Sequence, residues 1–168
     1  MKNPTAALAA VALGSLFAAS AQASTTDWGT HDTLEVAASI TPVGAFEDSF
    51  LFNLTNTSSV FSTAVSNNLT GVLGLSNGVV SLYRELGSVD EAVGSFAFND
   101  VTGSISHSFG ALLGGDYYYL VTGAGTGSMG GFYTLSSTVS AVPEGKTLAL
   151  LLAGLGVVGF VAKRRRPR

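Results

Sequence analysis

Short apolar runs separated by turn-forming residues fill the chain between residues 34 and 139. Nine such runs, each five to eight residues long, have the length and the Val, Phe, Tyr and Thr content of β-strands. They cover residues 34–40, 50–54, 60–65, 69–75, 79–85, 93–98, 105–109, 116–122 and 132–139. Gly, Asn and Pro between the runs supply turns, of which Ser76-Asn77-Gly78 is the clearest.

No apolar pattern of helical period continues for three turns in this region, and only residues 88–92 are expected to form a helical turn. Regular short strands predict an all-β fold, an antiparallel β-sandwich of eight or nine strands with jelly-roll-like or immunoglobulin-like topology. We expect one such domain over residues 24–141. Its opening stretch, residues 24–33, reads as a polar lead-in in which Trp28 covers one end of the core.

Alternation along the strand that contains residues 46–54 places a carboxylate on an apolar face. Phe46, Asp48 and Phe50 share one side of a strand with a period of two residues. A buried carboxylate needs hydrogen bonds or a cation. We expect Asp48 to accept backbone N–H groups at a turn; pairing with Arg84 and ligation of Ca²⁺ are the alternatives.

The first 23 residues have the pattern of a secretory signal peptide. Lys2 is a positive n-region, residues 6–19 form an apolar stretch, and Ala21-Gln22-Ala23 fits a signal-peptidase site. No twin arginine precedes the apolar stretch. We therefore expect export by the Sec machinery and a mature chain that begins at Ser24.

Residues 142–168 form a tail with three parts. The motif Val142-Pro143-Glu144-Gly145 precedes an uncharged apolar run over residues 147–162, and a basic segment, residues 163–168, ends the chain. A helix of this run would extend about 24 Å, against about 30 Å for a bilayer core. Because Gly145 and Thr147 can extend the run and basic side chains can reach the headgroups, we predict a C-terminal transmembrane helix over residues 147–162, with basic stop-transfer residues on the cytoplasmic side. These residues include Lys163, Arg164, Arg165 and Arg166.

Charge is distributed unevenly along the chain. Of eight Lys and Arg and eleven Asp and Glu, seven cations and one acid lie outside residues 24–141. The body therefore keeps Arg84 and ten acids, a formal charge of −9 (1 − 10). So acidic a surface argues against nucleic acid as a partner. The absence of Cys excludes disulfides, thiolate metal sites and Cys nucleophiles.

Residues with catalytic potential are few and scattered. His31 lies in the lead-in, and His107 lies on a predicted strand with Ser104 and Ser106 nearby, where we expect an exposed or edge-strand His. Two His without Cys give a weak metal site at best. No G-x-S-x-G motif occurs with a strand–turn–helix context. We therefore expect no catalytic residues, no metal and no cofactor.

Three other motifs receive structural interpretations. The adjacent acids Glu47-Asp48 and Asp90-Glu91 point to opposite faces of a strand, so neither forms a glycosidase pair by itself. Residues 123–127 resemble a phosphate loop only in their letters and read as a hairpin loop. The run Tyr117-Tyr118-Tyr119 must divide its rings between two faces, and the outward ring could stack on a sugar.

The tail resembles the PEP-CTERM sorting domain of Gram-negative bacteria. Val142, Pro143 and Glu144 match its Val-Pro-Glu-Pro motif, Gly145 replaces the second Pro, and residues 152–156 match the usual centre of its helix. In that family an integral-membrane exosortase recognises and removes such tails during export. The resemblance implies an inner-membrane intermediate, followed by release or attachment at the cell surface; a plain membrane anchor is the alternative.

The body resembles a particular group of these proteins. Phe46, Asp48 and Phe50 form the pattern F-x-D-x-F, similar to the opening motif of the FxDxF family of PEP-CTERM proteins. Residues 113–123 and 130–133 resemble the Gly- and Tyr-rich strands that precede the tail in that family. The family implies an exported surface protein and supplies no catalytic residues.

We therefore expect an exported, non-enzymatic surface or extracellular-matrix protein. Its expected partners are the Sec machinery, an exosortase and, through the C-terminal helix, the membrane. The family resemblance adds a setting of extracellular polysaccharide or biofilm. The alternatives are a carbohydrate- or calcium-binding module, a permanently anchored periplasmic domain and a secreted hydrolase.

Overall fold

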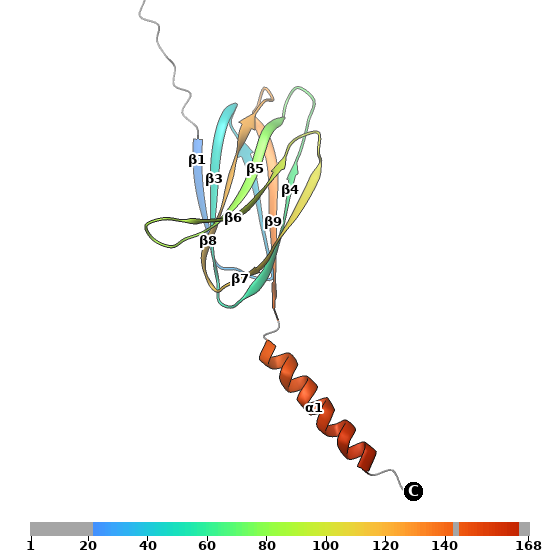
Figure 1. Cartoon of the computed structure of the whole chain (residues 1–168). Coiled ribbons are helices and arrows are strands. Elements are labelled where there is room, and N and C mark those ends of the chain that lie inside the picture. Colours follow the sequence, from blue (N-terminus) through green and yellow to red (C-terminus); the bar gives the residue numbers. More distant parts are fainter. Residues whose placement is uncertain (1–21, 143–144, 165–168) are drawn as a thin grey trace, which may run out of the picture.

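Nine strands in two facing sheets make up the body in the computed structural model, which describes residues 22–142 and 145–164 (Figure 1). The five-stranded sheet has the order β1-β3-β8-β5-β6, and the four-stranded sheet has the order β2-β9-β4-β7. The strands are β1 (Gln22–Thr30), β2 (Leu34–Thr41), β3 (Gly44–Leu54), β4 (Ser58–Ser66), β5 (Leu75–Arg84), β6 (Glu91–Phe98), β7 (Ser104–Leu112), β8 (Gly115–Gly125) and β9 (Gly131–Ala141). The predicted all-β sandwich is confirmed.

The strand order arises from nested pairing. β2 pairs with β9, β3 with β8, β4 with β7 and β5 with β6, all antiparallel. The chain thus resembles one long hairpin that has been rolled up, so that β4 also meets β9 and β5 also meets β8. This is jelly-roll connectivity, one of the two predicted topologies. β1 lies outside the nest, as an edge strand parallel to β3.

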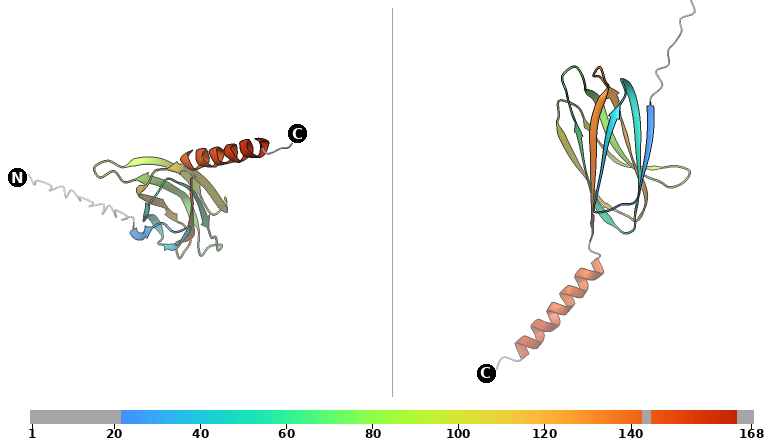
Figure 2. Two further views of the ribbon diagram at one scale, coloured as in Figure 1. Left: turned by 90° about the horizontal axis from the view of Figure 1, so that it is seen from below. Right: turned by 180° about the vertical axis from the view of Figure 1, so that it is seen from behind.

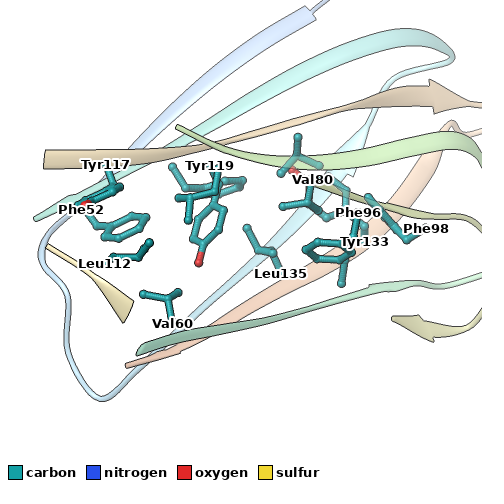
Figure 3. Packing of buried hydrophobic residues seen from close by; sticks show 14 of the residues in the cluster. Phe52, Val60, Val80, Phe96, Phe98, Leu112, Tyr117, Tyr119, Tyr133 and Leu135 are labelled. Carbon is teal, nitrogen blue, oxygen red and sulfur yellow. The ribbon is translucent and has the colours of Figure 1, made fainter. Parts of the chain in front are cut away.

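Alternate residues of the central strands form the core between the sheets. Phe46, Phe50 and Phe52 of β3 are buried, as the period of two predicts. Figure 3 shows the ring of Tyr119 extending from β8 toward the facing sheet, where Leu135 of β9 is also fully buried. Each such side chain contributes about 1.5–3 kcal/mol through its burial.

The first strand was not predicted. The predicted polar lead-in over residues 24–33 is wrong, because Gln22–Thr30 form β1 and pair with β3. Nearly all side chains of β1 are exposed, and Trp28 is the residue that packs against the core. An edge strand held by backbone hydrogen bonds needs no apolar alternation, so its sequence resembles a loop.

The predicted strand over residues 69–75 is wrong, and so is the predicted helical turn over residues 88–92. The backbone N–H of Leu73 donates to the carbonyl of Leu69 at 2.9 Å, which closes a local turn before β5 begins. Residues 88–92 form bends and the start of β6. In both places the residue pattern of a strand or a helix covers only a few positions and does not continue into the flanking sequence.

Ser76-Asn77-Gly78 forms a bulge inside β5 and not the predicted turn. The register with β8 shifts here, and Asn77 has a positive φ of 53°. A Cβ atom on Gly78 would lie 2.6 Å from the carbonyl oxygen of Phe98, so the strand needs glycine at this position. The Asn77-Gly78 pair therefore bends β5 within its length and does not form a turn between two strands.

The tail forms a helix, α1 (Gly145–Arg164), with Lys163 and Arg164 in its last turn. Figures 1 and 2 show that α1 covers neither sheet, and its described apolar side chains are exposed. No helix within the described ranges is long and apolar enough to cross a membrane. This corrects the prediction of a transmembrane helix over residues 147–162, whose length of about 24 Å falls short of the bilayer core of about 30 Å.

Candidate functional site

Two tyrosines stack on the outer face of the five-stranded sheet. Tyr83 of β5 and Tyr118 of β8 are register partners, and their ring centroids lie 5.2 Å apart at an angle of 16°. The neighbouring Tyr117 and Tyr119 point inward and are buried. The tyrosine run therefore divides its rings between two faces, as predicted. Tyr83 and Tyr118 are called the tyrosine platform below.

The loop between β5 and β6 fixes one edge of the platform. The hydroxyl of Tyr118 donates to Oδ2 of Asp90 at 2.9 Å. Desolvation by burial, followed by this hydrogen bond and the negative charges of Asp90 and Glu85, raises the pKa of Tyr118 to about 12. Tyr118 therefore remains a hydrogen-bond donor at neutral pH, and its ring is held against Tyr83.

An open hollow of about 230 Å³ lies beside the platform, at the end of the same sheet. Asp27, Asn53, Glu85 and Asp116 supply its polar groups. Nδ2 of Asn53 donates to Oδ1 of Asp116 at 2.7 Å. Leu51 also lines the hollow and is the register partner of Tyr118, so hollow and platform adjoin. This region is called the acidic hollow.

Platform and hollow together have the chemistry of a site for a neutral, hydroxyl-rich ligand. Aromatic rings offer apolar faces, and their hydroxyls add polar edges. Carboxylates and an amide next to such a surface can fix the orientation of ligand hydroxyl groups. Asp27, Glu85 and Asp116 would repel an anionic ligand from the same place.

Asp48 is buried, but its partners differ from those predicted. Its Oδ2 accepts hydrogen bonds from the hydroxyl of Tyr133 at 2.6 Å and from that of Ser39 at 2.9 Å. Both donors belong to the facing sheet. Burial first, then the hydrogen bond and charge of Asp48, raise the pKa of Tyr133 well above its usual value.

The predicted backbone capping by Asp48 and its pairing with Arg84 are therefore wrong. Asp48 is opposite Val121 of β8, whereas Arg84 is opposite Tyr117, four positions away along the strand. Arg84 lies over the ring of Tyr117, 6.0 Å from its centroid. As to Ca²⁺, no group of three or more His, Cys, Asp or Glu in the described part of the chain could hold a metal ion.

The F-x-D-x-F residues connect strands. Phe46 stacks on Tyr133 of the facing sheet, with ring centroids 5.7 Å apart, and Asp48 binds the hydroxyl of the same tyrosine. Phe50 packs against Trp28 of β1, with centroids 5.3 Å apart. The motif thus holds β1 and β9 against β3, and its contacts lie mainly in the core.

A chain of hydrogen-bonded side chains crosses the core. Tyr119 bonds Ser62 of β4 at 2.5 Å and Ser137 of β9 at 2.9 Å, and Ser137 bonds Nε2 of His31 at 2.8 Å. Nδ1 of His31 lies 2.5 Å from the carbonyl oxygen of Asp32. Because a carbonyl only accepts, Nδ1 is the donor, and Nε2 of the neutral ring accepts from Ser137.

This chain corrects the expectation that His31 lies in a lead-in. His31 is buried, and Ser137 is fully inaccessible. The Ser–His pair therefore supports the core and offers no reachable nucleophile. A sequence signal existed, since Ser137 continues the buried alternation of Tyr133 and Leu135 and so occupies an apolar position.

His107 lies on β7, an edge strand of the four-stranded sheet, as expected. Its ring stacks on Phe96, with centroids 5.7 Å apart, and contacts Phe109 at 4.8 Å. Ser104 and Ser106 alternate to the opposite, exposed face of β7. The three residues therefore do not form a Ser–His site.

The predicted processing residues lie at the margins of the described ranges. Ala23 and Ser24 are in β1, opposite Glu47 and Asp48, and the N–H of Val142 donates to the carbonyl of Thr57 at 3.2 Å. Lys163 and Arg164 lie in the last turn of α1, and the other predicted processing residues fall outside the described ranges. They are Ala21, Pro143, Glu144, Arg165 and Arg166.

No family model matches the chain. No curated protein matches it either. Solved structures with a similar arrangement include the pre-peptidase C-terminal domain of a collagenase from Bacillus anthracis, at 18% identity and a TM-score of 0.46, over 71% of this chain and 97% of that domain. The likeness is one of fold only.

Two other solved structures are more distant. PliG of Aeromonas hydrophila, a periplasmic inhibitor of g-type lysozyme, is 14% identical over 70% of this chain and 99% of its own, with a TM-score of 0.36. A protein designated CBM4 is 12% identical over 66% of this chain and 88% of its own, with a TM-score of 0.32. Such values say nothing about what this chain binds.

Proposed function

We propose that this chain is an exported, non-enzymatic surface protein whose sandwich binds neutral extracellular polysaccharide. The stacked pair Tyr83 and Tyr118 on the outer face of the five-stranded sheet is the observation that carries the proposal. Core packing does not require these rings, because the core is filled by the inward side chains of the same strands. The acidic hollow beside them supplies groups that bind hydroxyls.

Charge restricts the class of polysaccharide. Asp27, Glu85 and Asp116 line the hollow, and Asp90 holds the platform. Arg84, the one cation of residues 24–141, lies over Tyr117 and does not line the hollow. A uronate-rich polymer would meet carboxylates and no cation in this hollow, whereas a neutral glucan or galactan would not be repelled.

Export and sorting form the second part of the proposal. The signal-peptide pattern up to Ala23 supports Sec export, and the Val142-Pro143-Glu144 tail supports sorting by an exosortase. The exposed apolar side chains of α1 and the basic residues Lys163 and Arg164 suit recognition by a membrane enzyme. In this proposal the tail is a sorting signal, and the sandwich is the domain that reaches the cell surface.

Affinity electrophoresis of the native, processed protein tests the binding part. Migration should slow in gels that contain a neutral glucan or galactan and not in gels that contain alginate. Tyr118→Ala and Tyr83→Ala should each weaken binding by about two- to tenfold, because aromatic contacts contribute about 0.5–1.5 kcal/mol beyond their buried area. Val79→Ala, on the same face but away from the rings, is the control; equal binding by all variants would refute the site.

Intact mass and fractionation of the protein in its own host test the sorting part. A surface or medium species that begins at Ser24 and ends near Pro143 is expected. A species that still carries Arg164 to Arg166 would instead refute removal of the tail. The two parts can fail separately, since glycan binding does not depend on the fate of the tail.

A further inference from the structure

The outer face of the four-stranded sheet carries no charged side chain among the described residues. Its outward positions on β2 are Leu34, Val36, Ala38 and Ile40, and those in register on β9, β4 and β7 are Ser, Thr, Val and Phe. These residues are called the uncharged face. The other strand faces and loops hold ten acids within residues 24–141, so the absence of charge here is local.

We propose that the uncharged face joins two copies of this chain, sheet against sheet. Large apolar side chains on this face are exposed to solvent, with Val36 57%, Ile40 75% and Phe61 48% exposed. Val36 and Ile40 lie on β2 and Phe61 lies on β4, with mostly Ser and Thr side chains of β9 between the two strands. Exposed apolar side chains of this size are typical of interaction sites on soluble proteins. Burying them against a second copy would stabilise the pair through the hydrophobic effect.

Four hydroxyl groups of this face, those of Thr63, Ser106, Ser136 and Thr138, are already hydrogen-bonded to neighbours within it. Oγ1 of Thr63 lies 2.8 Å from Oγ of Ser106, and Oγ1 of Thr138 donates to the carbonyl of Phe61 at 3.2 Å. A polar group costs most to bury when it loses water without gaining a partner. These four hydroxyls keep their partners in a contact, which lowers the cost of removing water from the centre of the face.

Charge elsewhere on the molecule selects this face for contact between copies. Residues 24–141 carry a formal charge of −9, so any approach through another face brings carboxylates together. Contact through the uncharged face places the two five-stranded sheets on opposite outer sides. Four stacked sheets at about 10 Å spacing separate these outer faces by about 30 Å, well beyond the Debye length of about 8 Å.

The size of the face fits a reversible dimer. Four strands about 4.8 Å apart, each with four outward residues about 6.7 Å apart, cover roughly 500 Å² per copy. Two copies would bury roughly 1,000 Å², the lower limit for a specific interface. We therefore expect a reversible dimer, whose population rises with protein concentration, and not a permanent one. This inference does not depend on what the tyrosine platform binds.

Sedimentation velocity of the native, processed protein over a wide concentration range tests the proposal. The mass should rise from monomer to dimer with concentration, and added salt should change association little, because the acidic outer faces lie well beyond the Debye length from one another. Val36→Lys and Thr63→Lys should weaken association at least tenfold, because each places a charge within the contact. Ser81→Lys makes the same charge change on the outer face of the five-stranded sheet and should leave association intact.

Disulfide trapping gives a second readout that tolerates modest loss of stability. The natural chain has no Cys, so Ser136→Cys provides one thiol at the centre of the uncharged face, and Ser81→Cys provides the control on the other sheet. Mild oxidation should cross-link the first variant and not the second. A protein that stays monomeric at every concentration, a dimer unaffected by Val36→Lys, or equal cross-linking of both variants would overturn the proposal.

Discussion

Asp48 combines a buried charge with neutral hydrogen-bond donors. Tyr133 and Ser39 donate to the same carboxylate oxygen, and both bonds join β3 to the facing sheet. Hydrogen bonds to an ionised group contribute about 1.5–3 kcal/mol, about twice those between neutral groups. The side chain is therefore one of the polar links that holds the two sheets in register.

Asp48→Asn should lower the free energy of unfolding by about 1–2 kcal/mol, because an amide oxygen can still accept both bonds but without the charge. Asp48→Leu should cost more, since Tyr133 and Ser39 would lose their acceptor. Urea unfolding measures both values. Glu47→Gln, the neighbouring exposed carboxylate, is the matched control, and an Asp48→Asn protein as stable as the native one would refute this role.

Ser137→Ala should lower the free energy of unfolding by about 1–3 kcal/mol. It leaves Nε2 of His31 without its donor and the hydroxyl of Tyr119 without one acceptor. Ser95→Ala, an exposed serine of β6, should change stability by less than about 0.5 kcal/mol. Equal effects of the two substitutions would show that the buried chain contributes nothing.

Alkaline pH should destabilise the protein through Tyr119. Desolvation by burial raises its pKa to about 12, although the hydrogen bonds with Ser137 and Ser62 act in the opposite direction. An unfolded tyrosine titrates near about 10, so the folded state binds more protons between about pH 10 and 12. Stability is therefore fully present below about pH 10 and falls above it.

Urea unfolding at a series of pH values from neutral to strongly alkaline checks this prediction. The loss assigned to Tyr119 should reach about 2–3 kcal/mol by about pH 12. Tyr119→Phe should start from lower stability and decline less steeply over this range. A decline as steep as that of the native protein would assign the effect to other groups.

Sequence patterns predicted the position of these polar residues better than their partners. A period of two residues placed Asp48 on the buried face of its strand, which the structure confirms. Its donors come from β2 and β9, and Tyr133 lies 85 residues along the chain. Long-range pairing of this kind depends on strand order, which local periodicity does not contain.

At the scale of elements, β1 depends on one side chain for its tertiary contacts. Trp28 packs against Phe50, Phe52 and Tyr119, with ring centroids 5.3, 6.3 and 6.1 Å away. Trp28→Ala should therefore lower the free energy of unfolding by about 3 kcal/mol or somewhat less, since the ring is only partly buried. Thermal unfolding followed by circular dichroism measures the effect.

Trp28 is also the only tryptophan, so its fluorescence reports on β1 alone. In the native protein the emission maximum should shift to longer wavelength as β1 leaves the sandwich. If that shift precedes the loss of β-structure, the edge strand opens locally. Coincident transitions would instead show that β1 is part of the cooperative unit and contradict independent opening.

Errors of element prediction share a physical cause. The edge strand β1 is held by backbone bonds to β3 and so lacks the apolar alternation that identifies a half-buried strand. Ser76-Asn77-Gly78 has turn chemistry, but the same positive φ also makes a bulge. Local preferences identify backbone conformations, whereas pairing partners decide whether a conformation ends a strand or bends it.

At the scale of the whole molecule, the sandwich and the tail helix are separable. The described side chains of α1 are exposed, and α1 has no extensive packing against any strand of the described body. A protein that lacks residues 145–168 should therefore unfold within about 1–2 °C of the full chain. Calorimetry compares the two, and a shift of more than about 5 °C would reveal stabilising contact.

The candidate site illustrates what sequence can and cannot predict. The outward ring of Tyr118 followed from alternation within one strand. Its stacking on Tyr83 and its bond to Asp90 bring together β5, β8 and the loop after β5. Only the strand order places these residues side by side, and the same holds for the acids of the hollow.

The nested pairing also has a consequence for folding kinetics. Leu34 pairs with Thr138, so the outermost layer of the roll joins residues more than a hundred positions apart. Such contact order predicts slow folding, in milliseconds to seconds. A chain threaded through a membrane pore from its N-terminus cannot close this roll until β9, the strand next to the tail, has emerged. Under the proposed export, topology would therefore delay folding until nearly the whole body has crossed the membrane.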